Sequence, residues 1–209
     1  MLYRLISYFI YFILCTVFIS CSHKPEFVQL EVIMPVTEIK KTHIISRNIW
    51  TREGVNAFDI DKMTKIYRIT IHHTAIIEDS GNIARVKLML KKILAIHKHK
   101  KHWADIGYHY LIDREGRIWE GRNINFQGAH ARGDNNIGNI GIALLGNFDI
   151  EKPTLLQVKS LKDFTLKLQK KHGVRRSQIF GHEHFTITQC PGKFLIPIVD
   201  GLKRRYVSN

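Results

Sequence analysis

Two distant segments of this chain carry histidine and cysteine residues in a pattern typical of metal ligands. His72 lies in the run Ile-His-His-Thr-Ala, and His182 and Cys190 lie in the run Gly-His-Glu-His-Phe-Thr-Ile-Thr-Gln-Cys-Pro-Gly. Two imidazoles and one thiolate hold Zn²⁺ by three protein ligands and leave a fourth position open, an arrangement typical of catalytic zinc. A fold that uses these ligands has to bring the two segments together.

The first of these histidines belongs to a predicted strand. Residues 65–72 are rich in β-branched and aromatic side chains and alternate between two faces, which predicts a strand that ends at the histidine pair. Adjacent residues of a strand point to opposite faces, so only one of His72 and His73 can face a given site.

Strand-like and helix-like segments alternate along the rest of the chain. Apolar residues at helical spacing predict a helix over 83–97, with His97 on its apolar face, and Thr154 with Gln157 forms a capping box that begins a second helix. The other predicted strands lie at 106–112, 117–121 and 140–145, the first two forming a hairpin. We predict a single α/β domain with a mixed central β-sheet flanked by helices.

The N-terminus has the pattern of an export signal. An apolar run over 5–20 follows Arg4 and ends at Ser20-Cys21-Ser22. This resembles a bacterial lipoprotein signal, in which residues 1–20 are removed and Cys21 is lipidated. An ordinary signal peptide and a membrane-anchoring helix are the alternatives, because about 17 to 25 apolar residues can span a bilayer. All three place the rest of the chain outside the cytoplasm.

From this signal we predict the domain organisation and the location. Residues 21–44 form a tether and N-terminal extension, and residues 45–209 form the folded domain. With Ser22 after the lipidated cysteine, we expect the periplasmic face of the outer membrane, with another envelope membrane or the periplasm as alternatives.

The cysteines support a metal site. Cys15 lies inside the apolar run and Cys21 at the processing point, so Cys190 is left alone in the body of the protein. Metal ligation would protect a single thiol in an exported protein. The alternative is a buried, inert cysteine that packs as a small apolar residue.

The chain is strongly basic, with 32 Lys and Arg against 18 Asp and Glu and a formal net charge of +14. Such a charge favours anionic partners, either phospholipid surfaces or nucleic acid. Export and the lack of a nucleic-acid motif exclude nucleic acid as the expected partner. The lysines lie mostly in helix-like stretches, so we interpret them mainly as solvated helix faces.

Several short motifs follow one another in a fixed order. They are Ser46-Arg47-Asn48-Ile49-Trp50, 71–75, 105–112, 116–122, 128–131, 140–143, 146–148 and 182–190. Together they resemble the zinc-dependent N-acetylmuramoyl-L-alanine amidases of the phage T7 lysozyme and peptidoglycan recognition protein superfamily, over about Ile45 to Leu202. The resemblance implies one Zn²⁺ at the floor of a surface groove.

The resemblance also implies roles for single residues. It makes His72, His182 and Cys190 the zinc ligands, and leaves His73 to pack or to support a ligand. Tyr108 matches the family tyrosine at the zinc, where its hydroxyl can orient the attacking water or donate to the oxyanion. Thr188 stands where T7 lysozyme carries a lysine and many recognition-protein amidases carry threonine.

Two further residues match family positions in or near the substrate groove, His130 and Arg122. Core packing is the alternative for His130, and a structural ion pair for Arg122. We interpret Glu183 as a solvated carboxylate rather than a general base, and the histidines His97, His99 and His102 as a solvent-facing helix end.

The expected activity is hydrolysis of the amide between the lactyl group of N-acetylmuramic acid and L-alanine. The alternative is a non-catalytic peptidoglycan-binding module, as some relatives are after losing a zinc ligand. The expected partners are peptidoglycan or muropeptides, and a membrane through the N-terminal lipid. We expect a monomer.

Overall fold

The computed structural model describes residues 43–77 and 81–204. The export signal over 1–20, the lipidation site Cys21 and nearly all of the tether lie outside these described residues, so these features stay predictions. Within the described part of the chain, no helix combines the length and apolarity needed to cross a membrane.

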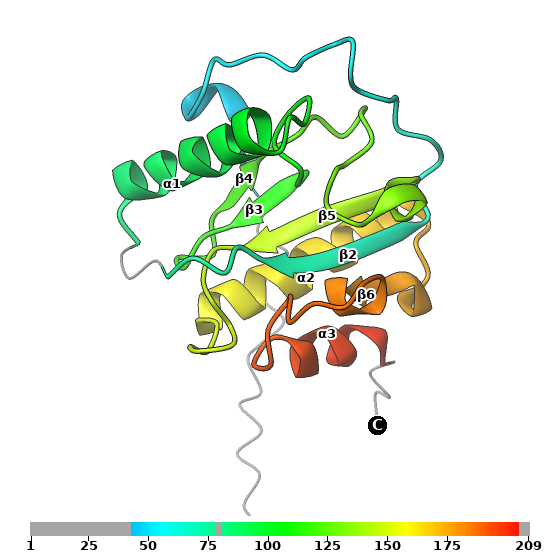
Figure 1. The fold of residues 1–209 in the computed structure, drawn as a ribbon. Helices are drawn as coiled ribbons and strands as arrows, with labels where there is room; N and C mark the ends of the chain where they lie inside the picture. The colour runs from blue at the N-terminus through cyan, green and yellow to red at the C-terminus, as the bar shows by residue number, and fades with distance from the viewer. Residues whose placement is uncertain (1–42, 78–80, 205–209) are drawn as a thin grey trace, which may run out of the picture. The chain divides into compact units, whose positions relative to one another are not determined.

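A mixed six-stranded sheet forms the centre of the domain, as predicted (Figure 1). Its strands are β1 (Ile44–Ile45), β2 (Arg68–His73), β3 (Tyr110–Ile112), β4 (Ile118–Glu120), β5 (Asn139–Leu144) and β6 (Ile179–Gly181). Their order is β1-β4-β3-β5-β2-β6, and among these strands only β3 and β4 pair antiparallel. The central strands β2 and β5 are buried on both faces, as is typical of parallel sheets.

Helices cover both faces of this sheet. The α1 helix (Ile83–Ala95) packs on one face, and α2 (Leu155–His172) and α3 (Ile196–Lys203) pack on the other (Figure 1). Alternation along the strands divides the core in two. Ile69 and Ile71 of β2 contact the α2 and α3 side, so Thr70 and His72 point to the α1 side.

Element boundaries differ from the predictions in ways that hydrogen bonds explain. The β2 strand begins at Arg68 instead of residue 65, because the backbone N–H groups of Tyr67 and Arg68 both donate to Gly138 O. The α1 helix ends at Ala95, and a π-helical turn follows over Ile96–Lys100. The β3 strand is confined to Tyr110–Ile112.

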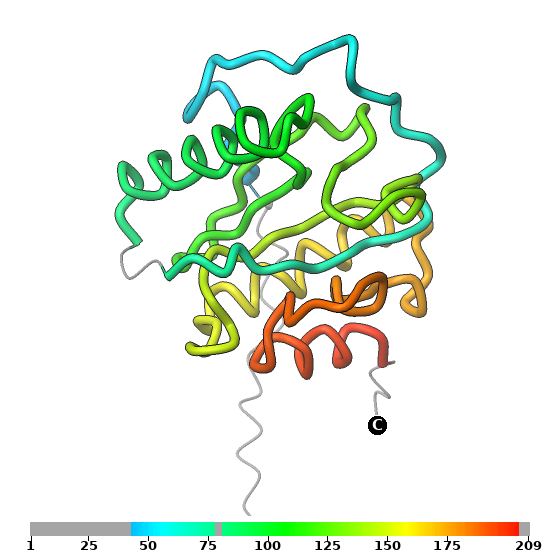
Figure 2. Tube along the Cα trace, in the orientation of Figure 1, coloured from blue at the N-terminus to red at the C-terminus, as the bar shows by residue number. Residues whose placement is uncertain are grey.

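The Ser-Arg-x-x-Trp motif fastens the N-terminal segment to the domain. The Arg47 guanidinium donates to both carboxylate oxygens of Asp105, at 2.7 and 3.1 Å, and Trp50 Nε1 donates to Glu120 O at 2.8 Å. Figure 2 traces the residues that follow, up to β2, as a long path with little regular structure. Backbone hydrogen bonds hold this path, among them Gln127 N to Asp61 O at 2.9 Å.

Candidate metal centre

Two neighbouring parallel strands bring the distant histidines together. Ile71 of β2 lies opposite Gly181 of β6, so the next residues along the two strands, His72 and His182, emerge side by side at the carboxyl ends. Their ring centroids are 4.5 Å apart. The carboxyl edge of parallel strands is a common place for binding sites in α/β folds.

The loop after β6 folds back and adds the thiol. A 3₁₀ turn over His182–His184 leads the chain away, and Glu183 N then donates to Cys190 O at 2.9 Å. Thr188 Oγ1 accepts from Cys190 N at 3.2 Å. One ligand atom each of His72, His182 and Cys190 lies within 4.8 Å of the others. The structure therefore brings together the three predicted ligands.

This donor set suits a zinc ion. Burial lowers the pKa of His72 well below its usual value, with the neighbouring His130 and His182 adding to the effect. Burial likewise lowers the pKa of His182, so both imidazoles are neutral and hold a free lone pair. Burial raises the pKa of the Cys190 thiol to about 12. A divalent cation would reverse this shift by taking the place of the thiol proton, and a thiolate with two imidazoles is a ligand set that Zn²⁺ prefers.

His73 points away from this cluster. Its Nδ1 accepts from Phe148 N at 3.2 Å, and its ring lies 6.2 Å from the Phe148 ring. Its backbone N–H donates to Cys190 Sγ at 3.4 Å. His73 thus supports the thiol through the main chain and packs through its ring.

Tyr108 lies against the cluster on the α1 side. Its ring centroid is 5.2 Å from that of His72. Desolvation of the hydroxyl, and then the neighbouring Cys190, raise the pKa of Tyr108 above its ordinary value. The phenol therefore keeps its proton and is a hydrogen-bond donor.

The interpretation of His97 as part of a solvent-facing helix end is wrong. His97 is buried, its Nδ1 accepts from Gly107 N at 3.0 Å, and its ring lies 5.5 Å from the Tyr108 ring. The π-helical turn and a positive φ of 55° at His102 bring Trp103 back onto His97, at 4.7 Å between ring centroids. His99 and His102 are exposed, as predicted. The helical spacing of apolar residues, which places His97 on the apolar face, predicts this burial correctly.

His130 does not line a groove as predicted. It is 6 % exposed, and both of its ring nitrogens have partners, His72 Nε2 at 3.1 Å and Asn139 O at 3.1 Å. The groove position expected from the motif is therefore replaced by a buried contact with a candidate ligand. No spacing in the sequence indicates this contact, because it depends on how the loop after β4 folds over β5.

Arg122 supports loops through its whole guanidinium. It donates from Nε to Ile106 O, from Nη1 to Gln127 O and from Nη2 to Asp105 O, at 2.8, 2.5 and 3.1 Å. Burial lowers its pKa to about 10, although Asp105 opposes this shift. The backbone carbonyls, rather than the ion pair considered as the alternative, take up these donors.

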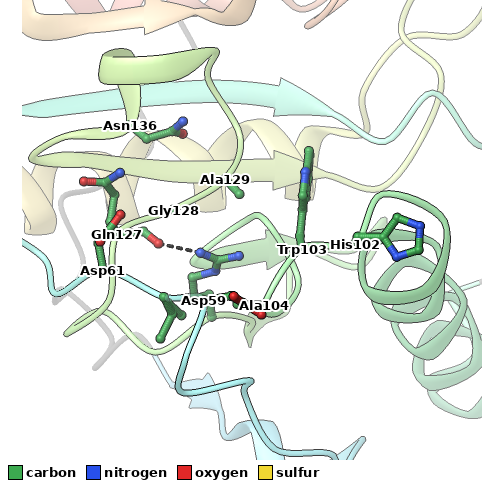
Figure 3. Close-up of a pocket in the computed structure, with 11 residues that line it drawn as sticks. Asp59, Asp61, His102, Trp103, Ala104, Gln127, Gly128, Ala129 and Asn136 are labelled. Atoms are coloured by element: carbon green, nitrogen blue, oxygen red, sulfur yellow. Dashed lines mark hydrogen bonds between the residues drawn. The ribbon is translucent and has the colours of Figure 1, made fainter.

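Arg122 also borders a polar pocket (Figure 3). Asp61 and Gln127 lie on one side of it, and Trp103 and His102 on the other. None of the three candidate ligands lines this pocket. The pocket and the cluster are instead connected through the packed rings of Trp103, His97 and Tyr108.

Glu183 is not the solvated carboxylate that we expected. It is half-buried, its Oε2 has no hydrogen-bond partner among the described residues, and desolvation raises its pKa. A Cβ added at Gly181 would overlap its carboxylate. The side chain thus packs over the end of β6.

Comparisons with known proteins match the part of the chain that contains this site. A family model described as N-acetylmuramoyl-L-alanine amidase matches residues 62–193. The peptidoglycan-recognition protein SC2 of Drosophila simulans is 38% identical over 132 residues, which are 58% of this chain and 66% of that protein. This chain therefore spans just under two thirds of that relative's length.

Solved structures share the fold. Drosophila peptidoglycan recognition protein SD has a TM-score of 0.69 at 29% identity, over 76% of this chain and 94% of that chain. The N-acetylmuramoyl-L-alanine amidase LysC of Clostridium intestinale has a TM-score of 0.63 at 28% identity, over 78% of this chain and 99% of that chain. Since the family model covers more than half of the sequence and all three candidate ligands, the chain belongs to the N-acetylmuramoyl-L-alanine amidase family.

Proposed function

We propose that this protein is a zinc-dependent N-acetylmuramoyl-L-alanine amidase. It hydrolyses the amide between the lactyl group of N-acetylmuramic acid and L-alanine of peptidoglycan stem peptides. The observation that carries the proposal is the convergence of His72, His182 and Cys190 within 4.8 Å, with Tyr108 beside them. Relatives are named both for recognising peptidoglycan and for cleaving it, so the complete ligand set favours the enzyme over a binding module.

The residues around the cluster match the needs of amide hydrolysis. Zinc, when bound, supplies a Lewis acid that polarises the scissile carbonyl and makes water a nucleophile near neutral pH. Tyr108 carries a phenol proton that can be donated to the oxygen on which negative charge develops. Thr188 accepts from Cys190 N, and its own hydroxyl proton stays available for the same purpose. Substrate contact by Arg122 is proposed at the polar pocket that it borders.

We also propose where the enzyme works. Lipidation at Cys21 would anchor the protein to an envelope membrane, with the outer membrane favoured, and place the domain beside peptidoglycan or muropeptides. This part of the proposal rests on the N-terminal sequence. We propose that the domain acts as a monomer.

The substitution Cys190→Ser tests the enzyme against the binding module. We expect zinc-loaded wild-type protein to release stem peptides from purified peptidoglycan, and Cys190→Ser to lose this release because an alcohol is a poor zinc ligand. Peptide release measured over time, with circular dichroism of both proteins, checks this. His99→Gln changes an exposed imidazole outside the cluster and serves as the control, with wild-type release expected.

Two outcomes would count against the proposal. Full activity of Cys190→Ser would remove Cys190 from the site. Wild-type protein that binds the polymer but releases no peptide would favour the binding module.

A further inference from the structure

A chain of close contacts leads from the main chain of β5 to the candidate metal ligands. Asn139 O lies 3.1 Å from His130 Nε2, and His130 Nδ1 lies 3.1 Å from His72 Nε2. On the far side of the His72 ring, Nδ1 lies 3.6 Å from Cys190 Sγ. All of these groups are buried or half-buried.

The Asn139 carbonyl decides the direction of both hydrogen bonds in this series of contacts, from His130 to Asn139 and between His72 and His130. A backbone carbonyl can only accept, so His130 Nε2 carries a proton. In a neutral imidazole the other nitrogen is then an acceptor, so His130 Nδ1 accepts from His72 Nε2. With its proton on Nε2, His72 has its free lone pair on Nδ1, which is the nitrogen that faces Cys190.

The surroundings hold the His130 ring in this position. A Cβ at Gly128 or at Gly141 would overlap the ring, so these two glycines leave room for it. Asn136 Oδ1 accepts from His130 N at 2.9 Å. Asn139 Nδ2 donates to Thr70 Oγ1 at 2.8 Å. This bond fixes Asn139, whose carbonyl accepts from His130.

We infer that His130 is a positioning residue that holds His72 in the tautomer with its lone pair on Nδ1, directed at the metal. Partners of this kind orient metal-binding histidines in many proteins and affect metal affinity by about 10- to 100-fold. The inference rests on the proposed function only for the identity of the metal. It replaces substrate binding as the role of His130.

Zinc affinity of paired variants tests this role. His130→Leu removes the acceptor and leaves the His72 N–H without a partner, and we expect zinc to bind about 10- to 100-fold more weakly in competition with a chromophoric chelator. His130→Asn retains an acceptor near the position of Nδ1, and we expect it to recover about tenfold of that loss. Equal losses in both variants would indicate packing alone and overturn the inference.

A second pair of variants leaves every polar side chain of the site unchanged. Gly141→Ala pushes the His130 ring away from its place and should weaken zinc binding in the same direction as His130→Leu. Gly201→Ala, where an added Cβ meets no atom within 4 Å, should bind zinc like the wild type. Wild-type zinc affinity in Gly141→Ala would contradict the positioning role of the His130 ring.

The tautomer itself is measurable by ¹⁵N NMR of the imidazoles in the zinc-free protein, with His72→Gln to assign the His72 signals. We expect the His72 proton on Nε2 in the wild type and a mixture of tautomers in His130→Leu. A His72 proton on Nδ1 in the wild type would overturn the inference and leave the proposed amidase intact. Normal zinc binding and tautomers without release of stem peptide would instead refute the amidase and leave this inference standing.

Discussion

At the scale of single residues, the protonation state of Tyr108 sets its role. Desolvation of its hydroxyl, and then the neighbouring Cys190, raise its pKa, so the phenol keeps its proton at neutral pH and can donate a hydrogen bond. The His97 ring supports it from behind, at 5.5 Å between ring centroids. In the proposed amidase, a donor held in this way would need no rearrangement as charge develops on the substrate oxygen.

Tyr108→Phe should therefore lower kcat by about 100- to 1,000-fold, the usual effect of removing one oxyanion donor. Zinc affinity should not change, since Tyr108 is not a ligand. Tyr110→Phe is the matched control, because Tyr110 packs on Phe164 on the other side of the sheet, at 4.7 Å. Steady-state kinetics on a soluble muropeptide would measure both; equal rates for wild type and Tyr108→Phe would remove the hydroxyl from the reaction.

Some residues of the site can be predicted from the sequence and others cannot. His72, His182 and Cys190 are recognisable because residue type and order are enough to indicate them. The contacts of His130 and His97 are not recognisable in this way, since they depend on a loop crossing β5 and on a π-helical turn after α1. The sequence also does not distinguish a buried arginine bonded to backbone carbonyls from a substrate-binding one, so the hydrogen bonds of Arg122 could not be predicted from it.

At the scale of elements, the capping box connects α2 to the sheet. Thr154 Oγ1 accepts from Gln157 N at 3.0 Å, and Gln157 Oε1 accepts from Thr154 N at 3.1 Å. Gln157 is fully buried and its amide donates to Leu145 O at 2.9 Å, just after β5. At the other end, Gly173 with a φ of 69° terminates the helix in the left-handed region that favours glycine.

Thr154→Ala should lower the free energy of unfolding by about 0.5 to 2 kcal/mol, the range for loss of an N-cap side chain. The hydroxyl also donates to Arg114 O at 2.7 Å, which places the loss toward the upper part of that range. Leu155→Ala, the next residue, is the control, because Leu155 is 88% exposed; its change should stay within about 0.5 kcal/mol. Urea unfolding measures both, and equal values for the two variants would contradict the capping role.

Element type was predictable here and element length was not. The capping box, the 3.6-residue pattern of α1 and the alternation of β2 are properties of short windows of sequence. The start of β2 depends instead on Gly138, and the end of α1 on a switch to π-helical hydrogen bonding. Both depend on residues or geometry that a local pattern does not contain.

At the scale of the whole molecule, buried neutral histidines make the stability depend on pH. Burial lowers the pKa of His97 and of His109 to about 4, compared with about 6.5 in an unfolded chain. The unfolded chain therefore binds protons that the folded domain does not bind. Stability contributed in this way is present above about pH 6.5 and is lost as the pH falls toward 4.

We expect the free energy of unfolding of the zinc-free domain to fall by several kcal/mol between pH 7 and pH 4, with about 3 kcal/mol for each of these two histidines. Urea unfolding at a series of pH values measures the slope. His99→Gln, at an exposed position, should leave the slope unchanged. A stability that is flat over this range would contradict this, because it would show that the folded and unfolded states take up the same number of protons.

We propose that the cluster of His72, His182 and Cys190 holds zinc and that the protein cleaves one particular amide. The most direct measurement is mass spectrometry of a defined muropeptide after treatment with protein of known zinc content. We expect about one zinc per chain and two products, a free stem peptide that begins with L-alanine and a glycan that retains its lactyl group. Intact muramyl-peptide linkages after treatment with zinc-loaded protein would contradict it.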